Sequence, residues 1–192
     1  MRYNSDHKEQ TKQKIVETAS REFRLHGFDG IGISALMTKL KLTHGGFYAH
    51  FEDKEDLIAQ ALAWSTDEFA SHVAEVLETD GVAGLVKLYL SEDHLKNPHF
   101  GCPLPALSLD VSRHPDLLQA QFGEKLERTV NLIAVSVPGK NEGERHARAW
   151  FLVGSLAGAI SMARAVADSA QRTMIVDAAK DQLLKAVYED GI

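Results

Sequence analysis

Residues 42–51 read Leu42-Thr43-His44-Gly45-Gly46-Phe47-Tyr48-Ala49-His50-Phe51. Thr43 is suited to cap a very short helix, because its hydroxyl can accept a hydrogen bond from a free backbone N–H group. Phe47 and Phe51 stand four residues apart and therefore share one face of that helix. Only two of the three neighbouring aromatic rings can point inward from so short a helix. We therefore expect one ring, with Tyr48 on another face than the two phenylalanines, to be left at the surface.

Two further helices are expected before this stretch. Apolar residues recur at helical spacing between Lys8 and His26. Gly27 is suited to end this first helix in a left-handed conformation, with Phe28 packing back on Phe23. Ser34 is expected to cap a second helix of about two turns. Three short helices with a tight turn between the second and third match the helix-turn-helix plan, whose last helix enters the major groove of DNA.

The rest of the chain also has helical periodicity. Asp53 is expected to cap a long fourth helix that runs to a break at Asp80-Gly81. No run alternates convincingly at a period of two, so the sequence predicts an all-α protein. Later helices are expected over residues 81–95, 107–112, 115–137, 144–166 and 172–189, with an irregular, proline-bearing connector over 98–105.

Length and composition set the domain plan. The chain has 192 residues, of which 44% are hydrophobic, which is enough for one or two small cores. We expect a helix-turn-helix domain over residues 1–53 and a helical domain over 54–192. No stretch resembles a signal peptide or a membrane span, so we expect no membrane partner and a cytoplasmic location. The single cysteine, Cys102, fits a reducing compartment.

The charge distribution allows a DNA-binding N-terminal segment, the reading head, attached to an acidic remainder of the chain, the body. The formal net charge of −6 argues by itself against a nucleic-acid partner. From residue 1 to 56, however, nine basic residues balance nine acidic ones, so the whole deficit lies in the remainder of the chain.

The quoted stretch, followed by Asp53-Lys54-Glu55, closely resembles the recognition-helix signature of the TetR family of bacterial regulators. The resemblance covers roughly residues 8–62 and thereafter only the helical layout. It implies a sequence-specific DNA-binding transcription regulator that binds double-stranded operator DNA as a homodimer and responds to a small-molecule effector. The resemblance assigns groove contacts to Thr43, His44, Gly45 and Gly46, and phosphate contacts to Tyr48, His50 and Lys54.

Physical chemistry supports several of these assignments. Each glycine costs a helix about 1 kcal/mol relative to alanine, so two in succession suggest that the backbone approaches DNA closely. A bound phosphate would favour both the helix N-terminus and the cation at Lys54. The sequence departs from the family at Leu40-Lys41, where members usually carry an Ala-Gly-like pair. A left-handed lysine costs on the order of 1 kcal/mol, so either the turn differs or Lys41 is kept for a phosphate.

The body offers candidates for an effector pocket and a dimer interface. The resemblance implies that the last two helices pair with those of a second subunit. Small residues, which let two helices approach closely, lie at Gly154, Ala157, Gly158 and Ser161. Candidates for the apolar lining of an effector pocket are Trp64, Phe69, Phe100, Cys102, Trp150, Phe151 and Met162.

Cys102 raises three alternatives. The irregular connector could expose its thiol to oxidants or electrophiles, which would make the protein a redox- or electrophile-sensing regulator, although a buried cysteine is more common. A remote alternative is an all-helical thiol enzyme that pairs Cys102 with His99 or His114, but no surrounding motif supports it. His94, His99, Cys102 and His114 match no standard zinc spacing.

The leading hypothesis is a repressor that its effector releases from the operator, because ligand binding favours a conformation whose two reading heads no longer fit adjacent grooves. Binding DNA does not determine the sign of the output, so activation stays open. We expect no enzymatic activity, no cofactor and no bound metal.

Overall fold

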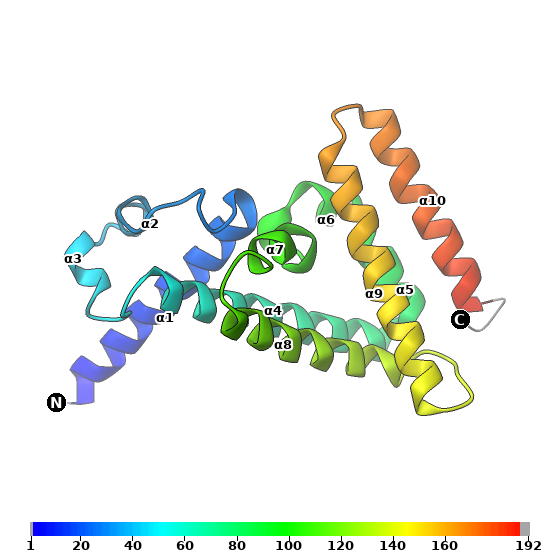
Figure 1. Cartoon of the computed structure of the whole chain (residues 1–192), viewed down its shortest axis with the longest axis horizontal. Helices are drawn as coiled ribbons and strands as arrows, with labels where there is room; N and C mark the ends of the chain where they lie inside the picture. The colour runs from blue at the N-terminus through cyan, green and yellow to red at the C-terminus, as the bar shows by residue number, and fades with distance from the viewer. Residues whose placement is uncertain (1, 189–192) are drawn as a thin grey trace.

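The computed structural model describes residues 2–188, with side chains described over 6–186, and this part of the chain is built of helices without a β-strand. Figure 1 shows the helices in chain order, with the first three at one end of the molecule and α9 and α10 at the other. The helices span α1 Arg2–His26, α2 Ile33–Lys39, α3 His44–Phe47, α4 Lys54–Thr79, α5 Gly81–Tyr89, α6 Glu92–Lys96, the 3₁₀ helix η1 Pro98–Phe100, α7 Leu104–Val111, α8 Asp116–Ala134, α9 Glu142–Ala165 and α10 Ser169–Tyr188.

The end of α1 is built as its sequence predicts. Gly27 has a φ of +75°, the left-handed conformation that glycine adopts at little cost. Its N–H donates to the carbonyl of Phe23 at 2.8 Å. The chain then reverses, and the ring of Phe28 meets that of Phe23 edge to face with 5.4 Å between centroids. The predicted stop after His26 is confirmed.

The start of α2 differs from the prediction. Gly32, with an extended backbone, is the N-cap, and the helix begins at Ile33. Ser34 is therefore inside the first turn and does not act as the cap. No side chain caps this helix, so nothing in the residue types marked its true start.

A single long helix, α4, connects the two ends of the molecule. The Asp53 carboxylate caps it by accepting the N–H of Asp56 at 2.8 Å, as predicted. Its first half contributes Leu57, Ile58 and neighbouring residues to a core shared with α1, α2 and α3. Its second half contributes Val73 to a separate core among α5, α8, α9 and α10. The proposed domain boundary after residue 53 therefore falls just before a helix that belongs to both cores.

The segment after α4 is more divided than expected. We predicted one helical segment over residues 81–95, but α5 ends at Tyr89 and α6 begins at Glu92. The cause is Ser91, whose extended backbone starts a new helix and whose hydroxyl accepts the N–H of His94 at 3.1 Å. Helix α7 begins three residues earlier than predicted. Pro103 is its N-cap, and Pro105 fits its first turn, where a proline needs no N–H partner.

The last three helices follow the prediction closely. Asn141 caps α9 by accepting the N–H of Glu144 at 2.9 Å. Helix α10 begins at Ser169 instead of Arg172, since the Asp168 carboxylate accepts the N–H of Gln171 at 2.8 Å. Its predicted end at Glu189 lies outside the described residues. Within residues 2–188, no helix combines the length and the apolar character needed to cross a membrane.

Candidate nucleic-acid interface

Helix α3 begins at the predicted cap. The hydroxyl of Thr43 accepts the N–H of Gly46 at 3.2 Å, and the helix continues for one turn to Phe47. Thr43, His44 and Gly45 are exposed, and Gly46 is half-buried. The N-terminal edge of α3 is therefore presented to solvent at the tip of the molecule (Figure 1).

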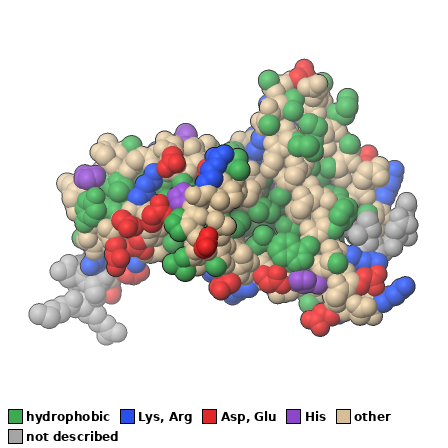
Figure 2. Space-filling model, in the orientation of Figure 1, with side chains coloured by type: hydrophobic (Ala, Val, Ile, Leu, Met, Phe, Trp, Pro, Cys, Tyr) green, Lys and Arg blue, Asp and Glu red, His purple; other side chains and the backbone are tan. Residues whose placement is uncertain are grey.

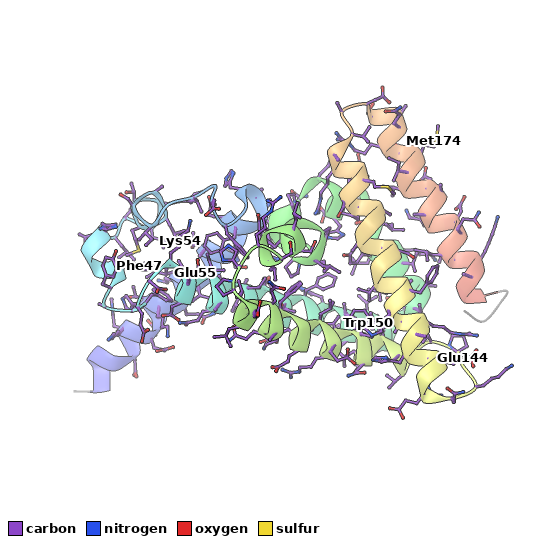
Figure 3. The ribbon with its side chains drawn as sticks, viewed as in Figure 1. Phe47, Lys54, Glu55, Glu144, Trp150 and Met174 are labelled. Carbon is purple, nitrogen blue, oxygen red and sulfur yellow. The ribbon has the colours of Figure 1, made fainter. Side chains whose placement is uncertain are left out.

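Two phenylalanines hold this edge in place. Phe47 and Phe51 are buried and their rings stack with 5.2 Å between centroids. Tyr48 is 57% exposed and rests edge-on against Phe47, at 5.2 Å. Figure 3 shows Phe47 at the far end of the molecule from Trp150 and Met174. The ring that the sequence leaves at the surface is Tyr48, whose hydroxyl is free to reach a ligand.

The turn between α2 and α3 keeps the left-handed geometry despite its lysine. Lys41 is exposed and has a φ of +58°. Its N–H donates to Thr38 and the next N–H, of Leu42, donates to Met37, both at 2.9 Å. The sequence left two alternatives, a turn of different geometry or a left-handed Lys41 kept for a phosphate, and the φ of Lys41 excludes the different turn. The strained lysine is retained at the surface beside α3.

Lys54 occupies the first turn of α4. Its Nζ lies 3.7 Å from Oδ1 of Asp29, whose side chain is fully exposed. An exposed pair at this distance is weak. The ammonium group therefore remains available to a phosphate, which the N-terminus of α4 would also attract.

Two basic residues of α1, Lys8 and Lys12, lie near His50, and the sequence did not mark them as part of the site. Burial lowers the pKa of His50, and the nearby cations of Lys8 and Lys12 lower it further. Lys12 also lies over the ring of Phe51, with Nζ 5.6 Å from the centroid. These lysines stand one helical turn apart on α1, which is the only signal in the sequence that could have singled them out.

The two glycines of α3 differ in their surroundings. A Cβ built on Gly45 would meet no atom of the protein within 4 Å, whereas one on Gly46 would lie 3.3 Å from the Thr43 hydroxyl. The protein itself therefore has room for a larger residue at position 45.

The body contains an apolar cavity that includes two of the seven predicted pocket residues. Phe69 and Cys102 line it. The structure places the other five elsewhere. Trp64 packs against the first core, and Phe100 is exposed beneath the guanidinium of Arg21. Trp150, Phe151 and Met162 are exposed on α9. Helical periodicity identified these residues as apolar but did not reveal which way each faces.

Cys102 is buried, and its thiol is unreactive. Its side chain is enclosed, and burial raises the pKa of the thiol to about 11. Only a thiolate is an effective nucleophile. The neighbouring histidine is His94, whose Nε2 accepts the backbone N–H of Cys102 at 3.1 Å, while His114 pairs with Glu55. The other predicted base, His99, packs its ring against Phe100 with 4.2 Å between centroids. With its pKa raised in this way, the Cys102 thiol is not activated for either the redox or the enzyme alternative. Among the described side chains, no three potential ligands cluster around a metal site.

Three of the four predicted dimer residues lie on one exposed face of α9, and the fourth, Ala157, does not. Gly154, Gly158 and Ser161 are exposed, while Ala157 packs inward. Trp150, Phe151 and Met162 extend the same surface, and none of these residues carries a charge. Figure 2 shows hydrophobic side chains over α9 and α10. An exposed apolar surface of this kind is typical of a protein interface.

Comparisons with known proteins agree with this geometry. Residues 15–61 match the family described as "Bacterial regulatory proteins, tetR family". The chain is similar to the HTH-type transcriptional repressor AcnR of Corynebacterium diphtheriae, with 34% identity over 76 residues, which are 40% of this chain and 38% of that protein. AcnR of Corynebacterium glutamicum is 33% identical over 82 residues, 43% of this chain and 42% of that one. The match thus spans about two fifths of these relatives.

The likeness of fold extends over the whole chain. A TetR transcriptional regulator from Chloroflexus aurantiacus superposes with a TM-score of 0.78, covering 96% of this chain and 97% of its own, at 19% identity. Residues 15–61 thus resemble the TetR-family model, and the fold of the whole described chain resembles that of this regulator.

Proposed function

We propose that this protein is a sequence-specific DNA-binding transcription regulator that binds its operator as a homodimer. The exposed Thr43–Tyr48 edge, held by the buried rings of Phe47 and Phe51, is the observation that carries the proposal. A helix presented in this way can enter the major groove. Lys41, His50 and Lys54, joined by Lys8 and Lys12, supply groups for the flanking phosphates.

The names of the relatives favour repression of transcription over activation. The two relatives that share the reading-head segment are both named as transcriptional repressors. Such a role would place the protein beside DNA, in the bacterial cytoplasm.

Release by an effector has a physical route through α1. Inside the body, Arg24 of α1 donates from Nη1 to the carbonyl of Gly101 at 2.7 Å, and Nη2 lies 3.3 Å from Glu68. Gly101 precedes Cys102, which lines the apolar cavity. A ligand that displaces the Gly101–Cys102 segment would therefore move the helix that carries the reading head.

A salt-titrated gel shift tests the DNA-binding proposal. The probe is the intergenic DNA upstream of the protein's own gene, with random duplex of equal length as the reference. The wild type should bind the intergenic probe more tightly. Both Tyr48→Ala and Lys54→Ala should weaken binding, and Lys54→Ala should reduce the salt slope by about 1 because one phosphate contact is lost.

Lys87→Ala is the matched control, since Lys87 is an exposed lysine on α5, in the body. It should leave affinity and salt slope unchanged. If the wild type does not distinguish the intergenic probe from random duplex, the proposal of a sequence-specific regulator fails.

A further inference from the structure

The cavity in the body has an almost purely apolar lining. It lies between α4, α5, α8, α9 and the start of α7, with Phe69, Leu85, Leu126 and Leu156 among its walls. No residue that lines it carries a charge. Thr66 and Thr129 also line it, and the hydroxyl of each donates to a carbonyl of its own helix.

Tyr89 is the exception in this lining. Its side chain is buried, and its hydroxyl has no nitrogen or oxygen partner among the described residues. The group beside it is the thiol of Cys102, whose sulfur is only a weak acceptor. Burial raises the pKa of Tyr89 well above its ordinary value, so the hydroxyl keeps its proton and is a donor. A buried donor without a partner is costly and uncommon in native proteins.

The ring of Tyr89 is held rigidly, so its hydroxyl has a defined position. Phe69 and His94 both meet it edge to face, with centroids 5.7 and 4.5 Å away. His94 is itself fixed, because its Nδ1 donates to the carbonyl of Tyr89 at 2.6 Å and its Nε2 accepts from Cys102. A preorganised polar group in an apolar cavity is the arrangement that gives a small-molecule site its specificity.

We propose that the effector is a small, uncharged and mainly apolar molecule, and that one oxygen of this molecule accepts a hydrogen bond from the Tyr89 hydroxyl. Charged molecules are selected against, because no residue that lines the cavity carries a charge and burying an unpaired charge is expensive. The nearby guanidinium group of Arg164 already donates to the carbonyls of His94 and Leu95. This inference rests on the proposed function only in calling the molecule an effector.

Ligand binding requires this cavity to widen. Its volume in the structure is about 30 Å³, roughly the share of one water molecule. One wall consists of Cys102, Pro103 and Leu104, where the chain passes from an irregular connector into α7. This wall can move with less loss of helical hydrogen bonding than the other walls, which are helix interiors.

Four probes of nearly equal shape test the proposed chemistry. Acetophenone carries a carbonyl acceptor, α-methylstyrene replaces that carbonyl by a methylene group, benzoate is an anion and benzamidinium is a cation. Calorimetric titration of the full-length protein without DNA should give acetophenone an affinity about five-fold higher than α-methylstyrene, the effect of one net hydrogen bond. Benzoate and benzamidinium should not bind measurably.

Two variants assign the preference to Tyr89. Tyr89→Phe keeps the ring and should abolish the five-fold preference while α-methylstyrene still binds. Thr129→Val is the matched control, because it removes a hydroxyl that lines the same cavity but already has a partner. It should keep the preference.

Three outcomes would overturn the inference: benzoate or benzamidinium binding more tightly than acetophenone, a preference that survives in Tyr89→Phe, or no binding by any probe. These outcomes are separate from a failure of the proposed function. Ligand binding is measured without DNA, and the gel shift measures DNA binding without ligand, so either can fail while the other holds.

Discussion

Lys41 keeps a backbone conformation that lysine seldom adopts. Its φ of +58° costs on the order of 1 kcal/mol relative to glycine. The fold gains nothing visible from the side chain, which is exposed and enters no ion pair among those formed by the described residues. Strain of this kind tends to persist where a site needs the side chain. A phosphate contact from Lys41 would account for it.

A single added methyl group at Gly45 should change protein stability and DNA affinity in opposite directions. We predict that Gly45→Ala raises the free energy of unfolding by up to about 1 kcal/mol, because alanine is the better helix former and its Cβ meets no protein atom. The same methyl group would meet DNA. We expect affinity for the operator to fall about ten-fold or more, as overpacking of 1–3 kcal/mol implies. Urea unfolding and gel shifts measure the two effects.

Gly123→Ala on α8 is the control for this pair of measurements. A Cβ at position 123 also meets nothing within 4 Å, and the residue is exposed in the body. It should gain similar stability without losing affinity. An unchanged affinity for Gly45→Ala would show that α3 does not approach DNA at this position.

At the scale of elements, the connector between α6 and α7 is tied to both ends of the molecule. Gly101 packs so closely on His94 that a Cβ there would lie 2.1 Å from the imidazole. Arg24 of α1 bonds to the Gly101 carbonyl, and Arg164 of α9 donates to the carbonyl of His94 at 2.6 Å. The connector therefore links the reading head, the cavity and α9.

His94 should make the stability of this connector depend on pH. Burial is the largest cause that lowers the pKa of His94, to about 4, whereas the unfolded chain has a histidine pKa of about 6.5. The neutral native form is therefore fully favoured above about pH 6.5. Stability should be lost as pH falls from there toward 4, by at most about 1.4 kcal/mol per pH unit from this group.

Urea unfolding between pH 4.5 and 7.5 at one protein concentration checks this prediction. His94→Gln should be less stable at pH 7.5, and its deficit against the wild type should shrink as the pH falls. His72→Gln, at an exposed position on α4, should follow the wild type. A deficit for His94→Gln that stays constant across this range would contradict the buried neutral histidine.

In the whole molecule, the reading head and the uncharged face of α9 lie at opposite ends (Figures 1 and 3). Two copies paired through α9 would leave both heads free at the outside of the dimer. Such a pair can address two successive major grooves, which are about 34 Å apart.

We predict that Gly158→Glu converts this dimer into monomers. A Cβ at Gly158 meets nothing within 4 Å, so the monomer has room for the new side chain, but pairing would bury its charge. Sedimentation velocity should show the lighter species. Affinity for a full operator should fall about 100-fold or more, because the second head no longer binds intramolecularly.

Gly123→Glu places the same charge on an exposed position of α8 with equal space. It should remain dimeric and retain its affinity. If Gly158→Glu also remains dimeric, the interface lies elsewhere on the molecule.

Local sequence signals located most of the helices, because their causes lie within a few residues. The caps at Thr43 and Asp53 and the left-handed stop at Gly27 are examples. The split between α5 and α6 was missed because helical periodicity continues across Ser91. The start of α2 at Gly32 was missed because no side chain marks it.

The residue pattern was enough to predict the all-helical fold and the aromatic residue that α3 leaves exposed, since spacing along one helix decides which side chains share a face. Which apolar residues line a cavity and which are exposed on α9 could not be predicted in this way, because that depends on what each helix packs against in the folded molecule. The same holds for Lys8 and Lys12, brought beside His50 by the packing of α1. The unpartnered hydroxyl of Tyr89 is likewise a property of the assembled core, where five segments distant in sequence meet.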